Sequence, residues 1–193
     1  MSTYKNSHGE IALPHKRRQS GLGIVEVLVA LVIVSVGVLG MASLQLTGMK
    51  HSSGGFNRSK ALLFAQSMAT RMRINDVAAD LQDYDGFDST GFSCNAVPAP
   101  YCQARKGAAA AACTPTELAT FDKFSVACGD VGINGAEKGV IGSLPNGTLT
   151  ITCLDSPCDP GDAYEVNVSW TEGRSRTVAD ELVTKRVQMR LKP

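Results

Sequence analysis

Residues 16–49 read KRRQSGLGIVEVLVALVIVSVGVLGMASLQLTGM, and this stretch decides the fold. It opens with the basic cluster Lys16, Arg17 and Arg18 and continues as an apolar run in which Glu26 is the only charged residue. A helix needs ~20 apolar residues to cross a bilayer, so the run is long enough to span one. Because basic residues favour the cytoplasmic side, the chain that follows the run is predicted to lie outside the cytoplasm.

Glu26 needs an explanation, because a carboxylate inside a membrane span costs ~2.5 to 3.5 kcal/mol on insertion scales. Three interpretations are open. The run could be a plain membrane anchor, with Glu26 near the positive end of the helix dipole. It could be a secretory signal peptide, although the apolar region of such peptides spans only ~7 to 15 residues. The third interpretation depends on the order of the parts: a basic cluster, Gly21, then Glu26 and an unbroken apolar helix.

This order resembles the class III signal of type IV prepilins and of the pseudopilins of type II secretion. The resemblance implies that prepilin peptidase cuts between Gly21 and Leu22, discards the leader and methylates the new amino group of Leu22. The apolar helix would remain on the mature protein, as an inner-membrane anchor and later in the core of a filament. Two residues depart from the family pattern, which usually has Phe in place of Leu22 and Ser or Thr in place of Gly23. Both departures should weaken processing without abolishing it.

The resemblance also gives Glu26 a partner. Residues at i and i+4 lie on one helix face, so the carboxylate could pair with the amino group of Leu22 in the same chain. In the pilin family, the carboxylate is thought to pair with the amino group of a neighbouring subunit. Because an ion in a low dielectric is tolerated mainly when it is paired, this interaction would set the register of subunits during assembly.

The chain is expected to have four parts. They are a discarded leader at 1–21, a transmembrane helix at 22–49, its amphipathic continuation at 50–80 and a periplasmic head at 81–193. Helical periodicity resumes beyond the membrane in an apolar stripe, with Arg71 and Arg73 off it: Ala61, Ala65, Met68 and Met72. Leu22 to about Val77 would then form one long helix. Gly54–Gly55 is its weak point, and a hinge there is an open alternative.

The head is predicted to combine a further helix with an antiparallel sheet, which makes the fold class α+β. Thr114, Pro115 and Glu117 form a typical helix start. The helix should run to about Phe124, with an inner face made of Leu118, Phe121 and Phe124. Later segments alternate apolar and polar residues as strands do, at 149–153, 164–171 and 186–191. One face of each strand should cover a helix while the other meets water.

The six cysteines all follow the apolar run, and an even number on the exported side favours disulfides in an oxidising periplasm. The sequence does not choose among their pairings, and we take the sequential set as the expectation: Cys94–Cys102, Cys113–Cys128 and Cys153–Cys158. Their spacing lacks the C-x2-C pairs of a zinc site. Asp83, Asp85 and Asp88 could ligate calcium, but the full loop signature is missing, so a solvated acidic loop is preferred. We expect no metal and no cofactor.

Composition argues against two further classes of function. The net charge is +1 and no basic stripe follows the apolar run, so nothing indicates binding to nucleic acid. The histidines stand at positions 8, 15 and 51, in the leader or at the membrane edge, where none can serve the head as a general base. An enzyme is therefore not expected, and no catalytic residue is assigned.

Two stretches resemble one pilin subgroup, the type IV pilus modification protein PilV. The first joins RMRIN at 71–75 to DYD at 83–85, and the second is CTPTELATFD at 113–122. A tryptophan often expected after the second stretch is absent, and the glycine-rich residues 129–142 also depart from the subgroup. The resemblance implies a minor pilin that helps to initiate or cap the type IV pilus, with other minor pilins and the major pilin as partners. A minor pseudopilin of type II secretion and a membrane-anchored periplasmic adhesin remain the alternatives.

Overall fold

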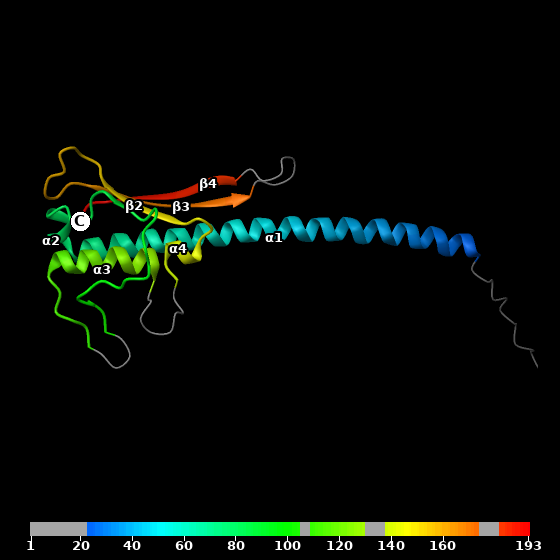
Figure 1. Cartoon of the computed structure of the whole chain (residues 1–193). Helices are drawn as coiled ribbons and strands as arrows, with labels where there is room; N and C mark the ends of the chain where they lie inside the picture. The colour runs from blue at the N-terminus through cyan, green and yellow to red at the C-terminus, as the bar shows by residue number, and fades with distance from the viewer. Residues whose placement is uncertain (1–22, 105–108, 130–137, 174–181) are drawn as a thin grey trace, which may run out of the picture. The chain divides into compact units, whose positions relative to one another are not determined.

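The structure is a computed structural model that describes residues 23–104, 109–129, 138–173 and 182–193 (Figure 1). The chain divides into two compact units, Met1–Gly48 and Met49–Pro193. The long helix α1, Ile24–Ile74, belongs to both units and stays helical through Gly54 and Gly55. It ends three residues before the expected Val77, and the short helix α2, Asp76–Asp80, follows directly.

The second unit has the predicted α+β fold. Its sheet is antiparallel, in the order β1-β2-β3-β4. Three of the strands match the segments predicted from the alternation of apolar and polar residues. They are β2 Thr148–Cys153, β3 Tyr164–Gly173 and β4 Leu182–Leu191. The two-residue strand β1, Phe87–Asp88, is too short to leave a pattern in the sequence and was not predicted. The helices α3, Pro115–Cys128, and α4, Val140–Ser143, complete the unit.

The central strand β3 fixes the register of the sheet. Val166 lies opposite Ile151 of β2 and Met189 of β4, and Val168 lies opposite Leu149 and Val187. In β3, Tyr164, Val166, Val168 and Trp170 are all buried, while the residues between them are half-buried. This alternation confirms the expectation that one face of the sheet is covered and the other meets solvent.

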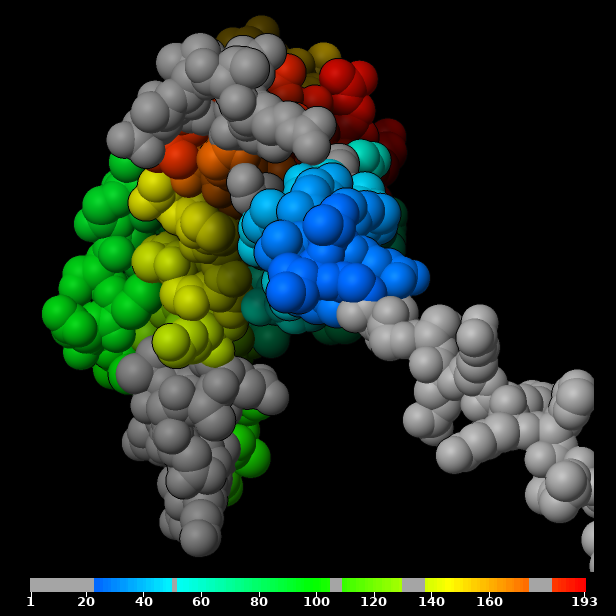
Figure 2. Space-filling model, turned by 90° about the vertical axis from the view of Figure 1, so that its right-hand side faces the viewer, coloured from blue at the N-terminus to red at the C-terminus, as the bar shows by residue number. Residues whose placement is uncertain are grey.

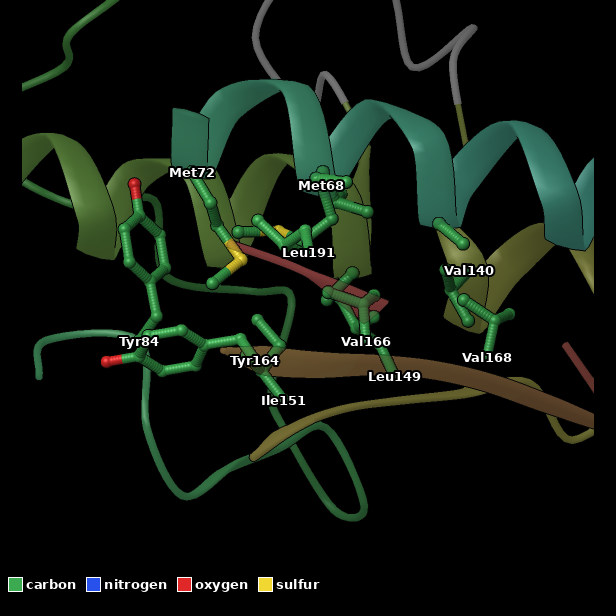
Figure 3. Close-up of a cluster of buried hydrophobic side chains, with 14 of the residues drawn as sticks. Met68, Met72, Tyr84, Val140, Leu149, Ile151, Tyr164, Val166, Val168 and Leu191 are labelled. Atoms are coloured by element: carbon green, nitrogen blue, oxygen red, sulfur yellow. The ribbon is translucent and has the colours of Figure 1, made fainter. Parts of the chain in front are cut away.

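The helices α1 and α3 lie side by side on the covered face of the sheet (Figure 1). The predicted stripe of α1 is fully buried there, with 0% exposure at Ala61, Ala65, Met68 and Met72. The two methionine side chains point from α1 toward Leu191, Val166 and the tyrosines of the core (Figure 3). Small residues at 61 and 65 let the helix approach the sheet, and the flexible methionines fill the remaining space. The apolar stripe thus anchors the second half of α1 in the core.

The start of α3 is confirmed in detail. Thr114 is the N-cap: its hydroxyl accepts a bond from the backbone N–H of Glu117 at 3.3 Å, and the Glu117 carboxylate accepts one from the N–H of Thr114 at 2.8 Å. The helix continues to Cys128 instead of ending near Phe124, and Gly129, with φ of 84°, follows it. Phe121 and Phe124 are buried as expected, but Leu118 is only partly covered.

Two of the three expected disulfides are wrong. The bonds join Cys94 to Cys128, Cys102 to Cys113 and Cys153 to Cys158. A Cys113–Cys128 bond cannot form, because α3 separates the two residues by about 22 Å at 1.5 Å per residue, whereas disulfides need Cα atoms within about 7 Å. The expected Cys153–Cys158 bond is present and closes the turn between β2 and β3.

Candidate functional site

The apolar half of α1 exposes its side chains all the way round. Ile24 is 82% exposed and Leu39 is 71% exposed, and the side chains of the first turns are in view in Figure 2 (blue). Among the described helices, α1 is the one whose length and composition would let it cross a membrane. A helix that is apolar on every face needs apolar surroundings. Within the described residues of the first unit, nothing supplies them.

Two hydroxyl groups of this apolar half are satisfied inside the helix. Ser35 donates to the carbonyl of Leu31 at 2.6 Å, and Thr47 donates to the carbonyl of Ser43 at 3.0 Å. Such bonds to the carbonyl four residues earlier satisfy the hydroxyl donors of Ser35 and Thr47, which lowers the cost of placing these two residues in hydrocarbon. These two polar side chains therefore do not oppose insertion into a membrane or packing in a bundle of helices.

Glu26 is the exception in this apolar half. It stands in the first turn of α1, where its backbone N–H donates to the carbonyl of Gly23 at 2.9 Å. The carboxylate is exposed and has no partner within the described residues. The first turn is the positive end of the helix dipole, which favours a carboxylate but does not neutralise it. An additional cation is therefore needed wherever this end of the helix leaves water.

The predicted processing residues lie outside the described residues. They are the basic cluster Lys16, Arg17 and Arg18 and the cleavage pair Gly21 and Leu22. The cut, the methylation of Leu22 and the pairing of Glu26 with a subunit amino group therefore stay predictions.

Sequence reasoning missed a buried polar network where α1 ends against α3. Arg71 Nη1 donates to Asp122 Oδ1 at 2.7 Å, and the hydroxyl of Tyr84 donates to Asp122 Oδ2 at 2.9 Å. The amide nitrogen of Asn75 donates to the Tyr84 oxygen at 3.0 Å and to the Pro115 carbonyl at 2.8 Å. Both oxygens of a carboxylate that is only 4% exposed are thus satisfied.

Electrostatics keep the Tyr84 hydroxyl of this network protonated. Burial, and then the charge of Asp122, hold the pKa of the Tyr84 hydroxyl far above its usual range. The phenol therefore remains a donor to Asp122 at all physiological pH values. A sequence signal for the network existed: Arg71 and Asn75 are at i and i+4, and Asp122 stands beside Phe121 on the face of α3 that was expected to be buried.

The acidic loop uses its carboxylates for backbone contacts. Asp85 accepts a bond from the N–H of Cys153 at 2.7 Å, and Asp88 accepts one from the N–H of Thr90 at 2.7 Å. The bonds from Thr90 lower the pKa of the Asp88 carboxyl. The remaining member, Asp83, presents its backbone carbonyl to Lys123 Nζ at 2.6 Å. The carboxylates of Asp85 and Asp88 thus serve the structure of the loop.

Comparison with protein-family models found two adjoining matches. Residues 16–42 match the prokaryotic N-terminal methylation motif, and residues 43–124 match the model described as type IV pilin Tt1218. The second match contains all members of the polar network, Arg71, Asn75, Tyr84 and Asp122. Searches of the curated proteins and of the solved structures found no match. The two family matches, together with the α+β fold and the exposed apolar helix, support a type IV pilin that carries the N-terminal methylation motif.

Proposed function

We propose that the protein is a minor pilin that takes part in assembly of the type IV pilus, in an initiation or tip complex with other minor pilins. The methylation motif and the type IV pilin match support a pilin role. The finer assignment is supported by the resemblance of residues 71–75, 83–85 and 113–122 to the PilV subgroup. In the fold these three segments meet in the polar network, so the resemblance concerns one structural unit.

In this proposal the newly made protein is first inserted into the inner membrane. Prepilin peptidase removes residues 1–21 on the cytoplasmic side and methylates Leu22, while the head lies in the periplasm. The subunit then leaves the bilayer and joins the filament with other minor pilins and the major pilin. Its head has no enzymatic role and supplies contacts between subunits.

One observation carries the proposal: an apolar helix exposed on all sides has one carboxylate, in its first turn and without a partner among the described residues. A plain anchor gains from such a charge only its interaction with the positive end of the helix dipole. A subunit that packs against others gains a position at which only a cation fits, because an unpaired ion in a low dielectric costs several kcal/mol. Glu26 is therefore assigned to subunit assembly, through the amino group of a neighbouring pilin.

The test is Glu26→Gln in a strain that lacks the wild-type protein. The amide removes the charge and leaves the partner cation unpaired, so we expect the leader to be cleaved normally but the surface pilus yield to fall at least tenfold. Asp76→Asn is the matched control, because it neutralises an exposed carboxylate at the start of α2, far along the chain from Glu26. Normal piliation by Glu26→Gln at the wild-type protein level would refute the assembly role. Normal pili with lost type II secretion would assign the protein to the secretion machine.

Processing is tested separately by substitution at the cut. Gly21→Leu places a bulky side chain at the scissile bond, so we expect the leader to stay attached and the membrane form to keep its full mass. Gly23→Ser restores the residue type that the family usually has and should mature at least as fast as the wild type. Mass spectrometry of the membrane fraction measures both. A Gly21→Leu protein of normal mature mass would contradict the class III signal.

A further inference from the structure

A basic cavity lies at the end of the sheet where β3 and β4 meet α1. Its volume is about 360 Å³, and Arg58 of α1 and Lys185 and Arg186 of β4 line it together with Trp170 and Glu172. In the described chain, none of these three cations has an ion-pair or hydrogen-bond partner. Elsewhere in the head, Arg71 is paired with Asp122 and Arg190 with Glu165. The cavity therefore gathers positive charge that the fold does not use.

The single carboxylate of the cavity is already engaged. Glu172 accepts a hydrogen bond from the indole N–H of Trp170 at 2.7 Å. With three cations and one carboxylate, the described wall carries a net charge of +2. Arg58 comes from α1, and Lys185 lies opposite Trp170 in the sheet and so shares its face, whereas the side chain of Arg186 leaves the other face of β4. Arginine and lysine both donate charge-assisted hydrogen bonds to the oxygens of a phosphate group. The ligand class that the cavity fits is an anion with several oxygen acceptors.

The position of the cavity along α1 indicates where such an anion would come from, because it lies close to the lipid headgroups if the apolar run spans a bilayer. The apolar run ends at Met49, and Gly54 and Arg58 of the cavity follow it on the same helix. At 1.5 Å per residue these positions lie about 8 and 14 Å beyond the run. The headgroup layer of a bilayer is about 5 to 8 Å thick on each side. Helical side chains lean toward the N-terminus, so Arg58 reaches back toward this layer.

An exposed aromatic side chain lies on the same stretch of helix. Phe56 is 60% exposed, and Lys60 Nζ lies 4.4 Å from the centroid of its ring. A bulky aromatic residue beside free cations is typical of surfaces that contact the boundary between hydrocarbon and headgroups. Cations on the outer side also work against the charge rule that orients a membrane helix. The three cations of the cavity have no ion-pair or hydrogen-bond partner among the described residues, so a ligand from outside the chain would explain their presence.

We propose that the cavity formed by Arg58, Lys185, Arg186 and Trp170 binds the headgroup of an anionic phospholipid at the outer surface of the membrane. The proposal rests on the proposed function in one respect, that the apolar run of α1 is anchored in a bilayer. It adds a contact by which the head is held against the membrane before the subunit is taken into a filament.

The sole tryptophan of the chain provides the assay, because Trp170 lies in the wall of the cavity. The full-length protein in neutral detergent micelles is titrated with short-chain phosphatidylglycerol or with short-chain phosphatidylcholine, and tryptophan emission is recorded. We expect a saturable change with phosphatidylglycerol and at least tenfold weaker binding of phosphatidylcholine. Equal responses to the two lipids would overturn the proposal. A response of the same strength to inorganic phosphate would assign the cavity to a free anion and would also overturn it.

Two triple variants of equal net charge locate the binding. Arg58→Ala/Lys185→Ala/Arg186→Ala should weaken phosphatidylglycerol binding at least tenfold, because each Lys or Arg near an anionic lipid contributes about fivefold. Arg73→Ala/Arg190→Ala/Lys192→Ala removes three charges away from the cavity and should bind as the wild type does. Equal weakening in both variants would overturn the site. Circular dichroism of each variant establishes that it is folded before it is titrated.

This experiment can fail independently of the proposed function. The titration needs neither cleavage of the leader nor assembly of a pilus. A protein that is cleaved and supports piliation but does not prefer phosphatidylglycerol would remove the lipid site and leave the pilin function standing. Conversely, the wild-type protein could bind phosphatidylglycerol as expected while the Glu26→Gln variant supports normal pili. That pair of results would refute the assembly role of Glu26 and leave the lipid site standing.

Discussion

The two halves of α1 are one continuous helix in opposite surroundings. Before Met49, apolar side chains face outward on every side, and Leu39 is 71% exposed. After Phe56, a single stripe of small residues and methionines is fully buried against the sheet, and Met68 is 0% exposed. The second half thus receives its apolar surroundings from the same chain. The first half has no such cover among the described residues, so its apolar surroundings have to come from outside the chain.

The largest effect on the head is expected from Asp122→Ala. It leaves the Arg71 guanidinium and the Tyr84 hydroxyl without their acceptor, and breaking a buried pair in this way costs ~3 to 5 kcal/mol of unfolding free energy. Denaturant unfolding of the full-length protein in detergent, followed by Trp170 fluorescence, measures the loss. Glu165→Ala is the control, since its pair with Arg190 lies at the surface and should contribute under ~1 kcal/mol. Equal losses in the two variants would show that the network does not hold the second half of α1.

The difference between the two halves of α1 is tested most directly by truncating one large apolar side chain in each half. Met68→Ala opens a cavity between α1 and the sheet and should cost about 3 kcal/mol of unfolding free energy. Leu39→Ala removes a similar volume from an exposed position and should leave the unfolding of the head unchanged. Both are measured in the same detergent. If Leu39→Ala destabilised the head as much as Met68→Ala, the two halves would not be energetically independent.

The smallest effect is expected at the join between the halves. Gly55 is helical and exposed, and nothing lies within 4 Å of the position of an added Cβ. Gly55→Ala should therefore raise the helix stability by ~1 kcal/mol, seen as a higher midpoint in denaturant. At Gly54 the added Cβ would lie 3.4 Å from a Glu172 oxygen, an ordinary contact, so Gly54→Ala should behave similarly. A clear loss of stability in Gly55→Ala would mean that the glycine pair is needed for bending.

Much of the fold could be predicted because it follows from local patterns. The alternation in Tyr164, Val166, Val168 and Trp170 indicates β3, and the start of α3 is stated by Thr114 and its neighbours. What could not be predicted depends on contacts between distant segments. Arg71 looked like a solvated residue beside the apolar stripe, because its partner Asp122 stands in a different helix.

The pairing of Cys113 could be narrowed from the sequence alone. Pairing neighbours along the chain ignored the helix predicted between Cys113 and Cys128, whose length alone forbids that bond. The remaining choice, Cys94 with Cys128, could be made only after α3 was placed beside the loop that carries Cys94. The sequence does indicate Glu26, Gly21 and Leu22 as a group, but their roles concern other molecules, and a single chain does not test them.

If the head is exported as proposed, the disulfide pattern has a consequence for the order in which the cysteines are oxidised. The Cys102–Cys113 bond is enclosed within the Cys94–Cys128 bond, which joins residues 34 positions apart. A chain that leaves the cytoplasm with its N-terminal helix held in the membrane presents Cys94 and Cys102 to the oxidant before Cys128 has crossed. If the first two cysteines join at that moment, the bond must later be exchanged through attack by another thiolate. In that case correct maturation of the head depends on oxidation that occurs only after α3 has crossed, or on an isomerase that exchanges the early bond.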